Sequence, residues 1–105
     1  MTEEVSTLYA NLLGETARIG WAEIMPFFAK GQVLWVAPSL DLVAVAEAIA
    51  EDRGQEVAAW MQAGQLQRLS DEQASSWSEN DPNNLWAVVL SPWVLVQARE
   101  ASAQQ

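Results

Sequence analysis

The stretch VAEAIAEDRGQEVAAWMQAGQLQRLS (residues 45–70) decides the fold class, because it reads as two short helices followed by a strand. Val45 and Ile49 lie one helical turn apart, on the apolar face of a helix that starts near residue 40. After a break that contains a glycine, Val57 and Trp60 repeat that spacing on a second helix. We expect these apolar residues to lie in the core of the domain.

The same reasoning extends outward along the chain. Asp and Glu near a helix start, Gly at a helix end, and runs of β-branched and aromatic residues mark the other elements. Helices are predicted over residues 3–18, 21–31, 40–52, 55–63 and 70–79. Strands are predicted over residues 32–37, 65–69 and 85–97. Ser39 is the predicted N-cap of the third helix, and Ser70 with Gln73 forms a predicted capping box for the fifth.

This order of elements predicts one α+β domain over residues 1–105, with about five helices and a small, mostly antiparallel sheet. Residues 98–105 form a small, polar tail that is expected to fray. Pro92 bends or bulges the strand over residues 85–97, or begins a separate strand, and the sequence leaves these alternatives open. Two helices followed by a strand is also how winged-helix domains begin, so a winged-helix-like fold is one alternative within this class. Another α+β fold in which two helices precede a strand would produce the same sequence pattern.

The composition excludes several kinds of chemistry. The 105 residues contain no Cys and no His, which removes disulfides, thiolate nucleophiles and the commonest metal ligand. Acidic pairs such as Glu51/Asp52 and Asp71/Glu72 do not have the spacing of a cation-binding loop. We therefore predict no catalytic residue, no metal site and no cofactor, and enzymatic activity is not favoured.

The charge of the chain argues against nucleic acid as a partner. Fourteen acidic residues against five basic ones give a formal net charge of −9. The basic residues are scattered singly, and the second helix of the opening stretch has none between Gln55 and Gln62. Because neutralised phosphates supply most of the non-specific affinity for DNA, such a surface is expected to bind DNA weakly. The N-terminus has neither a signal peptide nor a membrane span, so a cytoplasmic protein is expected.

Six tryptophans in 105 residues provide the candidates for a binding surface. Trp35, Trp60 and Trp86 are expected to fill the core. Trp77 and Trp93 are expected to lie partly exposed at a partner-binding patch, because Trp is enriched in interface hot spots. Glu56, on the acidic second helix of the opening stretch, is the third candidate for partner binding.

Three segments carry a family resemblance. They are LYANLLGETARIGWAEI (residues 8–24), VAPSLDLVAVAEAIAEDRGQEVAAWMQAGQL (residues 36–66) and LWAVVLSPWVLVQ (residues 85–97), of which the SPWVLVQ ending is the most specific. The chain resembles a family of small bacterial proteins known as domain of unknown function 2288. The resemblance implies a single-domain bacterial protein of about this length, and it implies no activity, ligand or catalytic residue.

The residues favour one functional hypothesis over two alternatives. The first is a non-enzymatic, acidic interaction module whose partner is a protein or a second copy of the chain. The second is a winged-helix-like transcription regulator that binds DNA weakly or with the help of a partner. The third is a small-ligand binder or a carboxylate-based enzyme, which would require a pocket lined by acidic groups.

Overall fold

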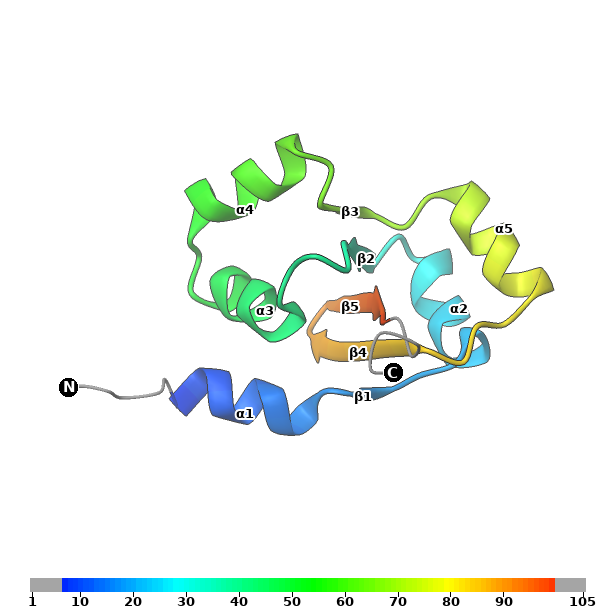
Figure 1. The fold of residues 1–105 in the computed structure, drawn as a ribbon, viewed down its shortest axis with the longest axis horizontal. Helices are drawn as coiled ribbons and strands as arrows, with labels where there is room; N and C mark the ends of the chain where they lie inside the picture. The colour runs from blue at the N-terminus through cyan, green and yellow to red at the C-terminus, as the bar shows by residue number, and fades with distance from the viewer. Residues whose placement is uncertain (1–6, 100–105) are drawn as a thin grey trace.

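The computed structural model of the protein describes residues 7–99, which form five helices and five strands. Along the chain the elements are α1 (Thr7–Glu15), β1 (Ala17–Arg18), α2 (Trp21–Ala29), β2 (Val33–Val36), α3 (Leu42–Ala50), α4 (Gly54–Gln62), β3 (Leu66–Arg68), α5 (Asp71–Glu79), β4 (Leu85–Leu90) and β5 (Trp93–Ala98). Figure 1 shows α1, α3 and α4 gathered at one side of the strands, and α2 and α5 at the other. The predicted α+β class is confirmed.

The five strands form one sheet in the order β1-β4-β5-β2-β3. Three of the four neighbouring pairs are antiparallel, and only β2 and β5 run parallel. The sheet is therefore mixed but mostly antiparallel, as predicted. The central position belongs to β5, which packs between β4 and the distant strand β2.

The apolar run over residues 85–97 is two strands. A turn at Ser91 and Pro92 separates β4 from β5, which pair antiparallel from Leu85 opposite Ala98 to Leu90 opposite Trp93. Of the alternatives for Pro92, the separate strand is correct. Both strands are rich in buried residues because helices cover both faces of the sheet.

The winged-helix-like alternative is not confirmed. A wing would require the strand after the two helices of the opening stretch to form a hairpin with the next strand along the chain. Instead α5 separates β3 from β4, and in the sheet β3 lies at an edge beside β2, with β5 between β2 and β4. Residues 45–70 therefore do form two helices and a strand, α3, α4 and β3, but the topology of their sheet is not that of a winged helix.

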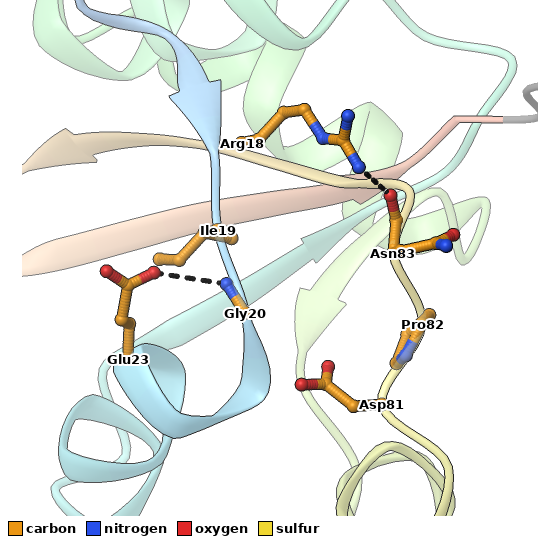
Figure 2. A pocket seen from close by; sticks show the side chains of 7 residues that line it. All are labelled: Arg18, Ile19, Gly20, Glu23, Asp81, Pro82 and Asn83. Atoms are coloured by element: carbon orange, nitrogen blue, oxygen red, sulfur yellow. Dashed lines mark hydrogen bonds between the residues drawn. The ribbon is translucent and has the colours of Figure 1, made fainter.

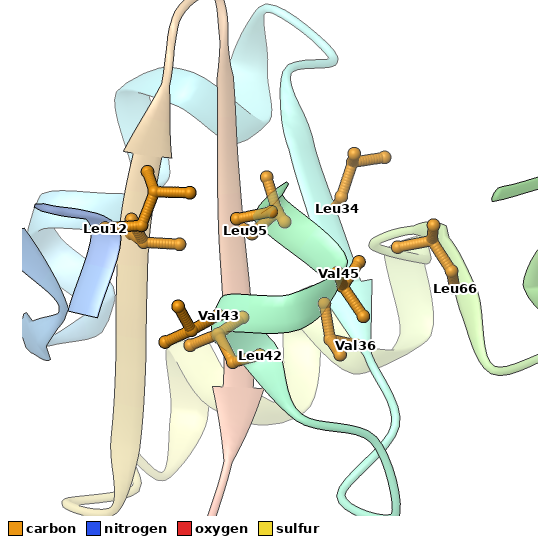
Figure 3. Close-up of a cluster of buried hydrophobic side chains, with 10 residues drawn as sticks. Leu12, Leu34, Val36, Leu42, Val43, Val45, Leu66 and Leu95 are labelled. Atoms are coloured by element: carbon orange, nitrogen blue, oxygen red, sulfur yellow. The ribbon is translucent and has the colours of Figure 1, made fainter. Parts of the chain in front are cut away.

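Two hydrophobic clusters lie on opposite faces of the sheet, because successive side chains of a strand point in opposite directions. On β5, Leu95 belongs to the cluster under α1 and α3, whereas Val94 and Val96 belong to the cluster under α2 and α5. Figure 3 shows the first cluster, with Leu42 and Val45 of α3 packed over the strands. The sheet is thus the middle layer of three.

The end of the first helix differs from the prediction. The first helix ends at Glu15, because Thr16 closes its last turn by donating from Oγ1 to the Leu12 carbonyl. Ala17 and Arg18 then pair with β4 as strand β1 instead of continuing the helix to residue 18. Residues 3–6 of the predicted helix lie outside the described residues.

The predicted N-cap of α3 at Ser39 is wrong. Asp41 is the N-cap, and its Oδ1 accepts hydrogen bonds from the backbone N–H of Val43 at 3.0 Å and of Ala44 at 3.3 Å. Asp41 also accepts a 2.7 Å hydrogen bond from the Tyr9 hydroxyl of α1. A carboxylate at this position satisfies two backbone donors and ties α3 to α1.

Two further predictions concern the ends of later elements. The predicted capping box at Ser70 is confirmed in its first half, because the Ser70 hydroxyl oxygen accepts from the Gln73 backbone N–H, and the return bond from the Ser70 N–H to the Gln73 side chain is not formed. Most of the predicted frayed tail lies outside the described residues. Of the two residues that are described, Ala98 ends β5, and the Arg99 backbone N–H donates to the Asn84 carbonyl.

Candidate functional site

An open pocket of about 350 Å³ lies where β1 enters α2, facing the turn that precedes β4. Its lining consists of residues 18–20, Glu23 and residues 81–83. Figure 2 shows these two segments facing each other across the pocket, although they are far apart in the sequence. The facing of these two walls therefore depends on tertiary structure.

The sheet positions one wall of the pocket. Arg18 pairs with Trp86 in the β1–β4 ladder, and the Ile19 backbone N–H donates to the Leu85 carbonyl. The chain then turns at Gly20 into the first turn of α2. Because β4 continues directly from residues 81–84, this pairing brings the two walls of the pocket together.

Two carboxylates are fixed at the N-terminus of α2. Glu23 accepts a 3.1 Å hydrogen bond from the Gly20 backbone N–H through Oε1, and Asp81 accepts a 3.2 Å hydrogen bond from the Trp21 backbone N–H through Oδ1. Gly20 is the N-cap and has no side chain of its own. Glu23 thus accepts from the N-cap residue in the manner of a capping box, Asp81 accepts from the first helical residue, and negative charge at this end suits the helix dipole.

Arg18 is the basic residue of the pocket. Its Nη2 donates a hydrogen bond to the backbone carbonyl of Asn83, on the opposite wall. Both ion pairs among the described residues involve Arg53, so Arg18 pairs with neither Glu23 nor Asp81. The pocket therefore holds charges of both signs that are not joined to each other.

The structure places the three predicted partner-binding residues apart. Trp77 was expected to be partly exposed, and this is wrong, because it is only 7% exposed and packs in the cluster under α2 and α5. Trp93 is half-buried on the other face of the sheet, with the Arg68 guanidinium 5.7 Å from its ring centre. Glu56 is exposed on α4, 3.6 Å from Arg53.

The three tryptophans expected in the core are half-buried. Trp60 and Trp86 pack against the cluster under α1 and α3, and Trp35 packs against the opposite cluster. The Arg99 guanidinium lies 5.0 Å from the ring centre of Trp86. Their role in packing is confirmed, although none of them is fully buried.

Acidic side chains on two parts of the surface differ in their partners. Arg53 bridges Glu51 and Glu56 where α3 meets α4, and its hydrogen bond to Glu51 raises the pKa of Arg53 above its ordinary value. On α5, Asp71, Glu72 and Glu79 are exposed and form no ion pair with a described residue. We call these three residues the α5 acidic surface.

Sequence reasoning missed Arg18, Glu23 and Asp81 as site residues. Asp81 lies in the segment between α5 and β4, and nothing in the sequence indicates that this segment faces the start of α2. In the described part of the chain, no group of three or more acidic, His or Cys side chains is placed to hold a metal ion. No helix within residues 7–99 is long and apolar enough to cross a membrane.

The fold and the pocket together define a small α+β domain, with helices on both faces of a mixed sheet and a mixed-charge pocket at the start of α2. The chain belongs to the family described as "Protein of unknown function (DUF2288)", whose model matches residues 7–98. This finding confirms the family resemblance of the three sequence segments.

A solved structure has the same fold. It is the NMR solution structure of PA1075 from Pseudomonas aeruginosa, which is 54% identical in sequence and superposes with a TM-score of 0.78. The match covers 97% of this chain and 94% of that one. No curated protein matched this chain.

Proposed function

We propose that the chain is a non-enzymatic interaction module of the bacterial cytoplasm, and that it binds a basic protein segment through the α5 acidic surface. The observation that carries the proposal is the contrast in charge pairing. Arg53 offsets part of the negative charge at the α3–α4 junction by pairing with Glu51 and Glu56, whereas Asp71, Glu72 and Glu79 have no ion-pair partner among the described residues. Unpaired surface charge of one sign attracts a partner of the opposite sign and raises its association rate.

Glu79 is the most informative member of the surface. Asp71 and Glu72 lie in the first turn of α5, where the helix dipole stabilises negative charge. Glu79 is the last residue of α5, where the dipole disfavours a carboxylate, and no basic residue accompanies it. A role in helix stability therefore explains the first two residues and does not explain the third.

The earlier candidates have less support as the main contact. Trp77 is buried, and Glu56 already has a cationic neighbour in Arg53. Self-association through a large apolar patch has little support as well, because the large apolar side chains that are about half exposed lie on four different elements. They are Leu13, Met25, Met61 and Val89. A DNA-binding role has less support still, since α4 contributes Glu56 and no basic residue.

The test is a titration of ¹⁵N-labelled protein with hexa-arginine, followed by backbone amide shifts. We expect saturable shifts centred on α5 that weaken as salt is added, because exposed charges are screened at physiological ionic strength. The double variant Glu72→Gln and Glu79→Gln is expected to weaken binding about tenfold. The matched control, Glu51→Gln with Glu56→Gln, removes the same charge from the α3–α4 junction.

Two results would contradict the proposal. One is an equal loss of affinity in both double variants, which would mean that only the net charge matters. The other is the absence of amide shifts on α5 even at low salt. Light scattering on the free protein checks the alternative of self-association, for which a dimer whose interface excludes α5 would be the decisive observation.

A further inference from the structure

The pocket at the start of α2 contains oppositely charged groups that do not neutralise one another. Arg18 and Glu23 come from the wall that leads into α2, and Asp81 comes from the facing wall, with no ion pair between Arg18 and either carboxylate. Opposite charges that share a small space ordinarily close into a contact pair. Here each of the three is held by a backbone group, so the space between them stays open.

The backbone anchors leave specific atoms available. Glu23 uses Oε1 and Asp81 uses Oδ1 for the backbone N–H groups of α2, so the second oxygen of each carboxylate has no hydrogen bond within the described residues. Arg18 uses Nη2 for the Asn83 carbonyl and keeps its other donors. Gly20 presents no side chain, and a Cβ built there would lie 3.6 Å from Asp81 Oδ2, an ordinary van der Waals contact, so this oxygen lies beside the Gly20 backbone.

The hydrogen bond that each of these exposed side chains already makes to the backbone reduces part of the rotamer entropy that ligand binding would otherwise cost. The pocket's volume of about 350 Å³ falls at the lower end of the range for small-molecule sites, and Ile19 and Pro82 add apolar surface to its lining. A ligand that fits must offer a cation to the two carboxylates, an anion to Arg18, and a small apolar group.

We propose that this pocket binds a small zwitterion of the α-amino acid class, which carries one ammonium and one carboxylate group. The ammonium group faces the free oxygens of Glu23 and Asp81, and the carboxylate faces the free donors of Arg18. This inference goes beyond the interaction module, because it concerns a different ligand and uses no residue of the α5 acidic surface.

The experiment titrates ¹⁵N-labelled protein with L-leucine, N-acetyl-L-leucine and L-leucinamide at millimolar concentrations. Leucine carries both charges, the acetylated probe lacks the ammonium group, and the amide lacks the carboxylate. We expect leucine to produce saturable shifts at the Gly20 and Trp21 amides, because these N–H groups donate to the pocket carboxylates. Each blocked probe is expected to bind at least about tenfold more weakly, a factor that corresponds to about 1.4 kcal/mol.

Two outcomes overturn the inference. If leucinamide binds as tightly as leucine, the pocket is a site for cations and Arg18 has no part in it. If leucine gives no saturable shift at Gly20 and Trp21, the pocket is not an amino-acid site. Neither result bears on the α5 acidic surface, whose probe is hexa-arginine, so the two proposals succeed or fail separately.

Variants that preserve the anchors separate binding from folding. Asp81→Asn keeps an oxygen that can accept from Trp21, and Glu23→Gln keeps one that can accept from Gly20, while each removes a negative charge. Both are expected to lose at least about tenfold in leucine affinity. Glu51→Gln removes the same charge at the α3–α4 junction, away from the pocket, and is expected to leave affinity unchanged. Unaltered affinity in both pocket variants would overturn the proposal.

Discussion

The neighbouring helices α3 and α4 have the same length, nine residues each, but opposite relations to the core. Six residues of α3 are buried, and none of α4 is buried. Asp41 caps the start of α3 with its side chain, whereas Arg53 at the start of α4 makes no such bond. The helical pattern in the sequence therefore does not indicate how stable a helix is against local unfolding. The difference in stability between α3 and α4 can be measured.

The largest expected effect is in amide hydrogen exchange. Amides in the middle of α3 are expected to exchange only through near-global unfolding, because the helix lies over the centre of the sheet. Amides of α4 are expected to exchange through local opening, with protection lower by at least about a hundredfold. Native-state exchange followed by NMR measures both in one experiment. Equal protection in the two helices would show that α4 is part of the same cooperative unit.

The same chemical change in each helix gives a second test. Val45 of α3 is 1% exposed, and Val57 of α4 is only partly buried. Val45→Ala is expected to lower the free energy of unfolding by about 2 kcal/mol, from lost burial and an unfilled cavity. Val57→Ala is expected to lower it by about 0.5 kcal/mol. Urea unfolding gives both values, and a larger loss at Val57 would reverse the comparison.

The start of α3 can be tested at the cap. Asp41→Ala removes the acceptor for two backbone donors and for the Tyr9 hydroxyl, so a loss of about 1.5 kcal/mol in the free energy of unfolding is expected. Ser39→Ala is the control, because Ser39 precedes the helix without capping it, and a change of no more than about 0.5 kcal/mol is expected. Thermal unfolding monitored by circular dichroism distinguishes them. A larger effect at Ser39 would restore the sequence-based assignment of the cap.

The end of α4 depends on a left-handed backbone. Gly64 has a φ of 76°, which a side chain disfavours, so Gly64→Ala is expected to cost about 1 kcal/mol. Gly54, at the other end of the helix, has no positive φ, and an added Cβ would meet nothing within 4 Å. Gly54→Ala is therefore expected to be neutral or stabilising. A stabilising Gly64→Ala, measured by the same urea unfolding, would mean that the turn after α4 adapts freely.

The smallest expected effect concerns pH. The hydrogen bond to Asp41, with smaller contributions from burial and from the negative charges nearby, raises the pKa of Tyr9 above its ordinary value of 10.0. A raised folded-state pKa means that the stabilisation is complete below about pH 10 and disappears as the pH rises through the folded-state value. Tyr9→Phe is expected to cost about 0.5 kcal/mol at neutral pH. The parent protein should lose this advantage over the variant in alkaline solution, as thermal unfolding across pH would show.

The sequence was sufficient to predict the α+β class and the existence of most elements, because periodicity and capping residues are local signals. Ser70 is a good example, since its cap on Gln73 was predicted and is present. Strand order could not be predicted, because β2 pairs in parallel with β5, which lies about sixty residues later. Two predicted helix boundaries were wrong for local reasons. At the start of α3 the Asp41 carboxylate is the cap in place of Ser39, and at residues 16–18 pairing with β4 replaces the last turn of the predicted helix.

The candidate site was the hardest feature to predict. Trp77 was misplaced because the polar residues around it on α5 suggest exposure, while Ala74 and Trp77, one turn apart, turn inward together. Glu23 and Asp81 could not be associated because they come from distant segments that only the β1–β4 pairing brings near. Asp81 accepts from the backbone across the fold and so leaves no motif in the sequence, whereas Glu23 stands three residues after the N-cap Gly20, which is the spacing of a capping box.

The place of β5 at the centre of the sheet has a consequence for how the chain assembles. Without β5, the remaining pairings join β1 to β4 and β2 to β3, and no strand is common to both halves. During synthesis the complete sheet therefore cannot form until residues 93–98 have left the ribosome, and until then apolar faces of the earlier strands are exposed. Long-range pairing of this kind slows folding, because distant segments must meet before their contacts stabilise the chain. The strand that joins the two halves of the sheet, β5, is therefore the last element of the domain to be synthesised.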